Sequence, residues 1–157
     1  MLTIDGEVDA PTTFTFDDLA RLDATYQVLD VSRIDAKRQG DAVTLTGLLA
    51  RVRPKPSARY LTLHSSSDDF HASIPLDAVR ERAIVIYRLH GQPLPTSAGG
   101  PVRFFIPDFA ACHTSEIDEC ANVKFVDRME FSPAPGRDNR PHDADEHAAL
   151  HEREGAG

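Results

Sequence analysis

The sequence predicts an α+β domain in which mixed or antiparallel sheets are accompanied by short helices. Residues 2–8, 60–64 and 70–74 alternate apolar and polar side chains with a period of two, as half-buried strands do. The segments with helical character are short, and they do not alternate strictly with strands as a doubly wound fold requires. A length of 157 residues with 41% hydrophobic residues is sufficient for one domain with its own core.

The first half of the chain contains three predicted strands and two predicted helices. Thr15 precedes Asp17 and Asp18, an arrangement typical of a helix N-cap with acids in the first turn. Pro54 ends the second helix because the residue before a proline disfavours the helical region. Residues 34–41 are polar and include a glycine, which predicts a loop. We expect strands at 2–8, 26–31 and 43–45, and helices from 16 to 22 and from 46 to 51.

A hairpin is predicted in the middle of the chain. Its arms are residues 60–64 and 70–74, and residues 65–69 between them have the composition of a turn. This pairing places His64 and His71 on facing arms as a cross-strand pair. A helix over 75–82 and strands over 83–87, 102–106 and 123–131 complete the predicted elements.

The composition changes after residue 131. Prolines, a glycine and many charges follow, and Leu150 is the only large aliphatic residue there. We therefore predict one domain over 1–131 and a disordered, acidic, histidine-containing tail over 132–157. His147 and His151 are spaced to bind a metal on a helix, but a solvated tail is the preferred interpretation.

Charge and hydropathy exclude two classes of partner. The net charge of −8 argues against a nucleic-acid-binding protein, which needs clustered lysine and arginine. No apolar run reaches the ~18–20 residues of a membrane span, and the chain starts without a basic or long apolar leader. We expect a cytoplasmic protein, in which Cys112 and Cys120 are reduced rather than disulfide-bonded.

Two short motifs carry a family resemblance. The chain reads His-Gly-Gln-Pro-Leu-Pro at 90–95 and Gly-Gly-Pro-Val-Arg-Phe-Phe-Ile-Pro at 99–107. They resemble the "NG-x-PL-P" and "G-x-P-[VL]-R-[LF]-x-x-P" motifs of the oxidoreductase molybdopterin-binding domain family, which has the sulfite-oxidase-like fold. Weaker similarities occur in the family's order at 2–11, 14–19, 43–49 and 58–70, so the resemblance covers about residues 2–107.

The resemblance implies a molybdopterin-dependent oxidoreductase. In the family, the arginine of the second motif helps to hold the pterin, which here is Arg103. Gly99, Gly100 and His90 are the other expected cofactor-binding residues, and molybdopterin with molybdenum is the expected cofactor. The implied partners are a small-molecule ligand or a redox partner protein.

The chain departs from the family pattern at two places. Catalytic members bind molybdenum through a cysteine after the first helix, but residues 26–32 contain none, and Asp30 lies at that position. Asp30 has two interpretations. In the preferred one it has a structural role, either capping a turn or pairing with Arg33 or Arg103. In the other it is a metal ligand, and a carboxylate is a hard one. After Pro107, acids replace the lysine-rich segment that grips the phosphate, which leaves Arg103 and Lys124.

Cys112, His113 and Cys120 form a second candidate site, with three interpretations. In the preferred interpretation, the two cysteines are small buried side chains. In the second, they bind zinc or iron together with His113. In the third, they are a redox-active pair. Their spacing matches neither a common zinc signature nor a C-x-x-C motif.

Two functions are therefore carried forward. The first is a molybdopterin-binding oxidoreductase-family domain that has diverged at the metal site. The alternative is a cofactor-free module that has lost the molybdenum cofactor and binds another ligand, metal or protein. Whether the protein is an enzyme is left open by the sequence.

Overall fold

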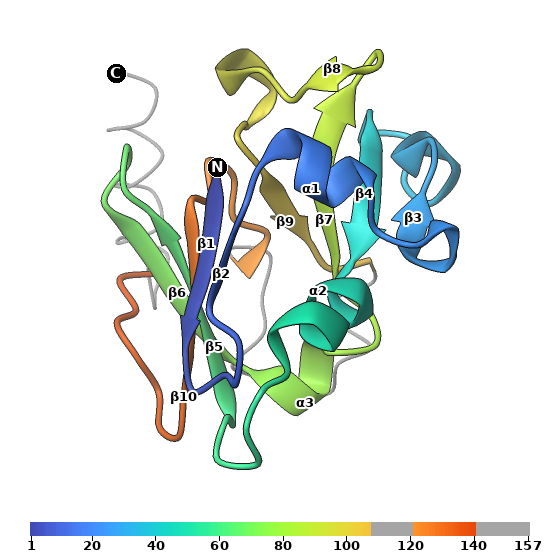
Figure 1. Cartoon of the computed structure of the whole chain (residues 1–157). Coiled ribbons are helices and arrows are strands. Elements are labelled where there is room, and N and C mark those ends of the chain that lie inside the picture. Colours follow the sequence, from blue (N-terminus) through green and yellow to red (C-terminus); the bar gives the residue numbers. More distant parts are fainter. Residues whose placement is uncertain (108–120, 141–157) are drawn as a thin grey trace.

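Two five-stranded sheets frame the part of the chain that the structure, a computed structural model, describes, namely residues 1–107 and 121–140. The first sheet has the order β2-β1-β10-β5-β6 and is mixed, because β1 and β10 are parallel and the other pairs are antiparallel. Figure 1 shows this sheet facing the second one, with the helices at the ends of the space between them. The strands of the first sheet are β1 (Leu2–Gly6), β2 (Thr12–Phe14), β5 (Tyr60–Ser65), β6 (Phe70–Pro75) and β10 (Arg128–Ser132).

The second sheet is antiparallel throughout. β7 pairs with β4 on one side and with β8 and β9 on the other, and β3 pairs with the far edge of β4. Short helices and an absence of strict strand–helix alternation confirm the predicted α+β class with mixed and antiparallel sheets. The strands are β3 (Gln27–Val28), β4 (Asp41–Thr44), β7 (Ile84–Leu89), β8 (Gln92–Pro93) and β9 (Arg103–Phe105).

The first two helices begin at threonines whose side chains cap them. The Thr15 hydroxyl accepts from the backbone of Asp18, and the Asp18 carboxylate accepts from the backbone of Thr15, a reciprocal capping box. The Thr44 hydroxyl caps the second helix by accepting from Gly47. The helices are α1 (Phe16–Ala20), α2 (Leu45–Val52) and α3 (Leu76–Val79), and the 3-10 turns are η1 (Ala24–Tyr26), η2 (Val31–Arg33) and η3 (Thr96–Ala98).

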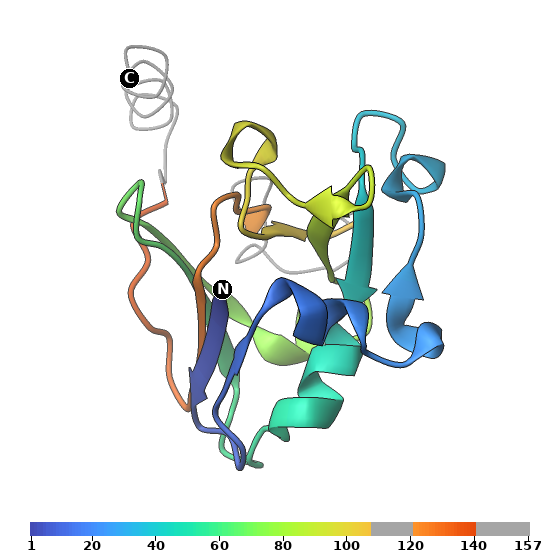
Figure 2. The ribbon, with the colours of Figure 1, turned by 45° about the horizontal axis from the view of Figure 1, so that its top comes forward.

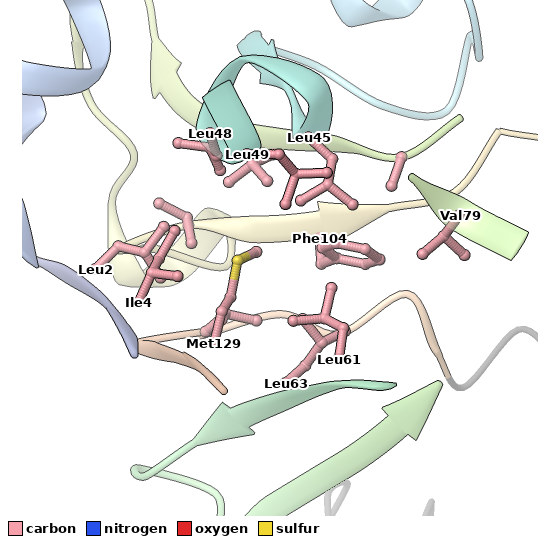
Figure 3. Packing of buried hydrophobic residues seen from close by; sticks show 14 of the residues in the cluster. Leu2, Ile4, Leu45, Leu48, Leu49, Leu61, Leu63, Val79, Phe104 and Met129 are labelled. Atoms are coloured by element: carbon pink, nitrogen blue, oxygen red, sulfur yellow. The ribbon is translucent and has the colours of Figure 1, made fainter. Parts of the chain in front are cut away.

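The main core fills the space between the two sheets. Alternate residues of the first sheet point inward, including Leu61, Leu63 and Met129, and they meet Phe104 from β9 and leucines from α2 (Figure 3). A second, smaller cluster lies on the opposite face of the second sheet. It contains Val31, Ala42, Ile84, Ile86, Leu94 and Phe105.

Two predicted strands are shorter than expected. The strand predicted over 26–31 is only Gln27–Val28, because Asp30 has a φ of 60° and starts the η2 turn. The strand predicted over 123–131 begins at Arg128, because Phe125 has a φ of 59° and interrupts the extended backbone.

The segment after β10 also differs from its prediction. Residues 133–140 run beside β6 (Figures 1 and 2), and Arg140 is buried. The Asn139 backbone N–H donates to the carbonyl of His71 at 2.9 Å. For these residues the predicted disorder is wrong, because polar side chains satisfy the backbone of a sheet edge. The rest of the predicted tail, 141–157, lies outside the described residues.

Within the described ranges, no helix is long and apolar enough to span a membrane.

The core predicts that replacing two different leucines by alanine has very different effects on stability. Leu63 is fully buried, whereas Leu29 is 63% exposed. We expect Leu63→Ala to lower the free energy of unfolding by about 2–5 kcal/mol, since it removes buried contacts and leaves a cavity. Leu29→Ala makes the same chemical change at the surface and should alter it by about 0.5 kcal/mol or less. Urea denaturation measures both, and equal effects would contradict the described core.

Candidate cofactor-binding site

The two family-like motifs form a tight connection between β7 and β9. His90 and Gly91 both have positive φ values, 53° and 78°, at the turn between β7 and β8. At Gly100, an added Cβ would lie 1.9 Å from the carbonyl oxygen of Leu94. The backbone of Gly100 also donates to Pro95 at 2.9 Å, so no side chain fits there. The predicted site residues Gly100 and His90 therefore shape this turn.

Arg103 lies on the face of the second sheet that points away from the main core. Its register partner on β7 is Ile86, a member of the smaller cluster. The side chain is half-buried, and its Nε has no hydrogen-bond partner among the described residues. Burial lowers the pKa of the Arg103 guanidinium, and the positive charge of Arg38 lowers it further.

Arg38 is a site residue that the sequence analysis did not identify. Its guanidinium carbon lies 4.9 Å from the ring centroid of Phe105, two residues from Arg103 on the same face of β9. The Nε of Arg38 is also buried without a partner in the described part of the chain. The chain segment between η2 and β4 therefore brings a second arginine to Arg103, which no spacing in the sequence indicates.

Gly99 and Lys124 lie against the same arginine. Gly99 has a φ of 104°, and a Cβ there would be 3.4 Å from Cδ of Arg103 and 3.2 Å from Cβ of Lys124. The carbonyl of Gly99 accepts from the backbone of Phe125 at 2.8 Å. The structure thus brings Gly99, Arg103 and Lys124 together.

An open cavity of about 420 Å³ lies beside this region. It joins residues that are distant in sequence, because the η2 turn and the β7–β8 turn lie side by side. The size is within the range of small-molecule sites. Its lining residues are Asp30, Ser32, Ala36, Gln39, Gly40, Asp41, Leu89, His90 and Gly91.

Asp30 makes the contacts of a turn-capping residue. Its Oδ1 accepts from the backbone of Ser32 at 3.2 Å and also from the Ser32 hydroxyl. Arg33 lies 3.7 Å from its other carboxylate oxygen, and the Asp30 backbone N–H donates to Asp41 at 2.8 Å. A left-handed φ of 60° suits aspartate and asparagine better than most residues. These contacts match the structural interpretation of Asp30, with Arg33 rather than Arg103 as its ionic partner.

The second candidate site cannot be compared with the structure. Cys112, His113 and Cys120 lie outside the described residues. Within residues 1–107 and 121–140, no group of three or more histidine, cysteine, aspartate or glutamate side chains is arranged to hold a metal ion.

Comparison with known families identifies the domain. The family model described as "Oxidoreductase molybdopterin binding domain" matches residues 39–139, which include Arg103 with its motif and the cavity residues from Gln39 to Gly91. Arg38 lies directly before the matched range. The chain belongs to this family. The predicted assignment to molybdopterin-binding oxidoreductase domains is thereby confirmed, and the cofactor-free alternative is not favoured.

Two relatives of this molybdopterin-binding domain agree with that assignment. The catalytic subunit MsrP of a protein-methionine-sulfoxide reductase from Ralstonia nicotianae is 26% identical over 147 residues, which are 82% of this chain and 44% of the relative. The crystal structure of the sulfane dehydrogenase SoxCD from Paracoccus pantotrophus matches with a TM-score of 0.60 and 22% identity, over 85% of this chain and 38% of that chain. The likeness to SoxCD confirms the sulfite-oxidase-like fold, and the chain spans less than half the length of either protein.

The geometry of Asp30 predicts different effects for two substitutions. Asp30→Asn keeps a side-chain acceptor for Ser32 and tolerates the positive φ, so stability should change by less than about 0.5 kcal/mol. Asp30→Ala loses the acceptor and should lower the free energy of unfolding by about 1 kcal/mol. Urea denaturation distinguishes them, and an equal loss in both variants would show that the carboxylate charge, not the cap, is what matters.

Proposed function

We propose that this domain binds the anionic end of molybdopterin between Arg103 and Arg38 and acts as an oxidoreductase domain. The observation that carries the proposal is the pair of buried arginine Nε atoms without partners in the described part of the chain. Membership of the molybdopterin-binding family supplies the identity of the anion.

The arginine pair is unfavourable without a negatively charged partner. Each buried N–H that lacks an acceptor costs about 1–3 kcal/mol, and two neighbouring positive charges repel each other. A phosphate satisfies both, because it accepts hydrogen bonds from guanidinium groups in planar, paired geometry. Lys124, which lies against Gly99 and is exposed, adds a third positive charge at the rim.

The glycines support the proposal from the backbone side. Gly99 at φ 104° leaves the space beside the Arg103 stem open, and Gly100 allows the chain to approach Leu94 closely. A turn without side chains lets a flat ring system approach backbone groups. We therefore assign Gly99, Gly100 and His90 to the wall of the pterin site.

The proposed site has basic residues for the phosphate of the cofactor but no assigned ligand for its metal. A bound molybdenum cofactor would supply two-electron redox chemistry to the domain. The described residues offer no thiolate, and Asp30 is occupied as a cap, so we assign no protein ligand to molybdenum from them. The cavity lined by Asp30 and Asp41 is open enough to admit a small-molecule ligand next to the cofactor.

The relatives indicate the kind of reaction. The names of MsrP and SoxCD describe a reductase and a dehydrogenase. We infer that this domain takes part in redox chemistry with a small-molecule substrate or a redox partner protein. A cytoplasmic location stays a prediction.

Loss of Arg103 should abolish cofactor retention. We expect the parent protein, produced in a host that makes molybdenum cofactor, to release a fluorescent pterin after acid oxidation, and Arg103→Ala to release less than a tenth as much. Arg33→Ala is the matched control, because that arginine is 82% exposed and its ionic partner is Asp30 in the η2 turn. Absence of pterin from the parent protein would overturn the proposal, and elemental analysis of the same samples would report molybdenum.

The arginine pair should also bind a simple anion. At ten times its Kd, inorganic phosphate should stabilise the folded protein by about 1.4 kcal/mol, a rise in Tm of about 3–5 °C over chloride at equal ionic strength. Arg38→Met and Arg103→Met should remove this rise, whereas Arg33→Met should keep it. A rise that persists in all three variants would reflect a general salt effect and not a site.

A further inference from the structure

A chain of four side chains crosses the outer face of the first sheet. His64 on β5 and His71 on β6 are register partners, and their Nδ1 atoms lie 2.7 Å apart. The outer nitrogens face carboxylates: Nε2 of His64 lies 3.0 Å from Glu130, and Nε2 of His71 lies 2.8 Å from Asp69. The two histidines are only 9% and 7% exposed, so these contacts replace water almost completely.

The contacts of the two rings have room for three hydrogens. Each Nε2 faces a carboxylate to which it can donate a hydrogen, and the Nδ1–Nδ1 contact takes one hydrogen between two nitrogens. With three hydrogens on four ring nitrogens, one ring is an imidazolium and the other is neutral. In that arrangement the pair of His64 and His71 carries a single positive charge.

A metal ion does not fit between these rings. Two nitrogens that bind one tetrahedral zinc at about 2.0–2.1 Å are about 3.3 Å apart. The Nδ1–Nδ1 separation of 2.7 Å is that of a hydrogen bond. One ring donates in this contact and the other accepts.

The same residues hold a segment that we name the strap, residues 136–140. The strap lies along β6, which is at the edge of the first sheet (Figures 1 and 2). His71 exchanges two hydrogen bonds with Asn139: its backbone N–H donates to the Asn139 side chain at 2.8 Å, and its carbonyl accepts from the Asn139 backbone at 2.9 Å. Asn139 also donates to the carbonyl of Asp69 at 2.7 Å, and Arg137 lies 3.3 Å from the Asp69 carboxylate.

The next residue that faces outward on β6 is held in the same way. The backbone N–H of Ser73 donates to the Asp138 carboxylate at 3.0 Å, and its carbonyl accepts from Arg140 at 3.2 Å. The Ser73 hydroxyl accepts from the backbone of Gly136 at 2.9 Å. The strap therefore satisfies the polar backbone groups of His71 and Ser73 at the sheet edge.

We propose that the His64–His71 pair is a proton-operated latch, which holds the strap on β6 while the pair shares one proton and releases it when a second proton binds. A second proton places two N–H groups opposite each other at the Nδ1 contact and adds a like charge. One ring must then move, and His71 is joined to the strap through its backbone and through Asp69.

Charged residues from β10, the hairpin turn and the strap surround the His64–His71 pair. Glu130 faces His64 from β10, and Arg128 lies 3.4 Å from the same carboxylate. Asp69 faces His71 from the hairpin turn, with Arg137 of the strap beside it. The remaining strap charges, Asp138 and Arg140, pair with each other at 2.7 Å.

The carboxylates of Asp69 and Asp138, which also take part in the contacts of the strap, do not take up protons between pH 5 and 7.5. The hydrogen bond from His71 and the charge of Arg137 hold the pKa of Asp69 below its usual value. Burial alone would raise the pKa of Asp138, but hydrogen bonds from Arg140 and from the backbone of Ser73 outweigh it and lower the pKa. Both stay ionised through that range, so their stabilising contacts are lost only at lower pH.

Hydrogen exchange on the full chain tests the latch. Protection factors, corrected for the intrinsic rate at each pH, are measured at pH 7.5 and 5.0 for the four amides of Gly136, Asn139, His71 and Ser73. We expect them to fall at least tenfold at pH 5.0, whereas the protected amides of β10 change less than twofold. Equal protection of the four amides at both pH values would overturn the proposal.

Two variants separate the histidine pair from other groups. His64→Gln removes the second titrating ring, so strap protection should become independent of pH, while His90→Gln, at the exposed turn, should keep the wild-type response. The same acid response in His64→Gln would overturn the proposal.

A direct measurement covers the case in which His64→Gln does not fold. Nitrogen NMR of the imidazole rings in the wild-type protein should show three ring hydrogens on the pair at pH 7.5 and four at pH 5.0. Two neutral rings at pH 7.5 would overturn the proposal.

Discussion

Alternation along β9 is the constraint on which the site depends. Phe104 points into the core between the sheets, so its neighbours Arg103 and Phe105 must lie on the opposite face. β7 obeys the same rule, with Val85 inward and Ile86 outward. The guanidinium of Arg103 is thus positioned by the packing of the core, and a rigid strand holds a charged group more accurately than a loop does. Arg38 reaches it by stacking on Phe105.

The outward faces of the two sheets differ in composition. The second sheet carries a small apolar cluster beside two arginines and an open cavity, so it presents charge to a ligand. The first sheet carries a polar row that includes Thr62, His64 and Ser73, and the chain following β10 covers it. Buried polar groups require partners, and here the segment next in sequence supplies them. One face carries the two arginines beside an open cavity, and the other is covered by the segment that follows β10.

Much of the fold could be predicted from local patterns, and the missing parts depend on tertiary contacts. The hairpin with its histidine pair and the Thr15 cap follow from period and turn chemistry, and the motif around Arg103 is found through its resemblance to the family. The sequence does not show the left-handed backbone of Asp30, and for that reason the strand predicted over 26–31 is longer than β3. Arg38 lies in a polar loop and gains its role only when β4, β7 and β9 align. The strap has the composition of a disordered segment, and only the free edge of β6 gives its polar side chains partners.

The place of β10 in the first sheet determines when this sheet can be completed during synthesis of the chain. β10 comes last among the strands of the described residues, yet it lies between β1, the first, and β5. During synthesis, β1 has no neighbour on that side until residue 132 has left the ribosome. Pairing of such distant segments gives a high contact order, which slows folding. The nascent chain therefore carries two incomplete pieces of one sheet with open inner edges, and these are the surfaces that a chaperone would have to shield.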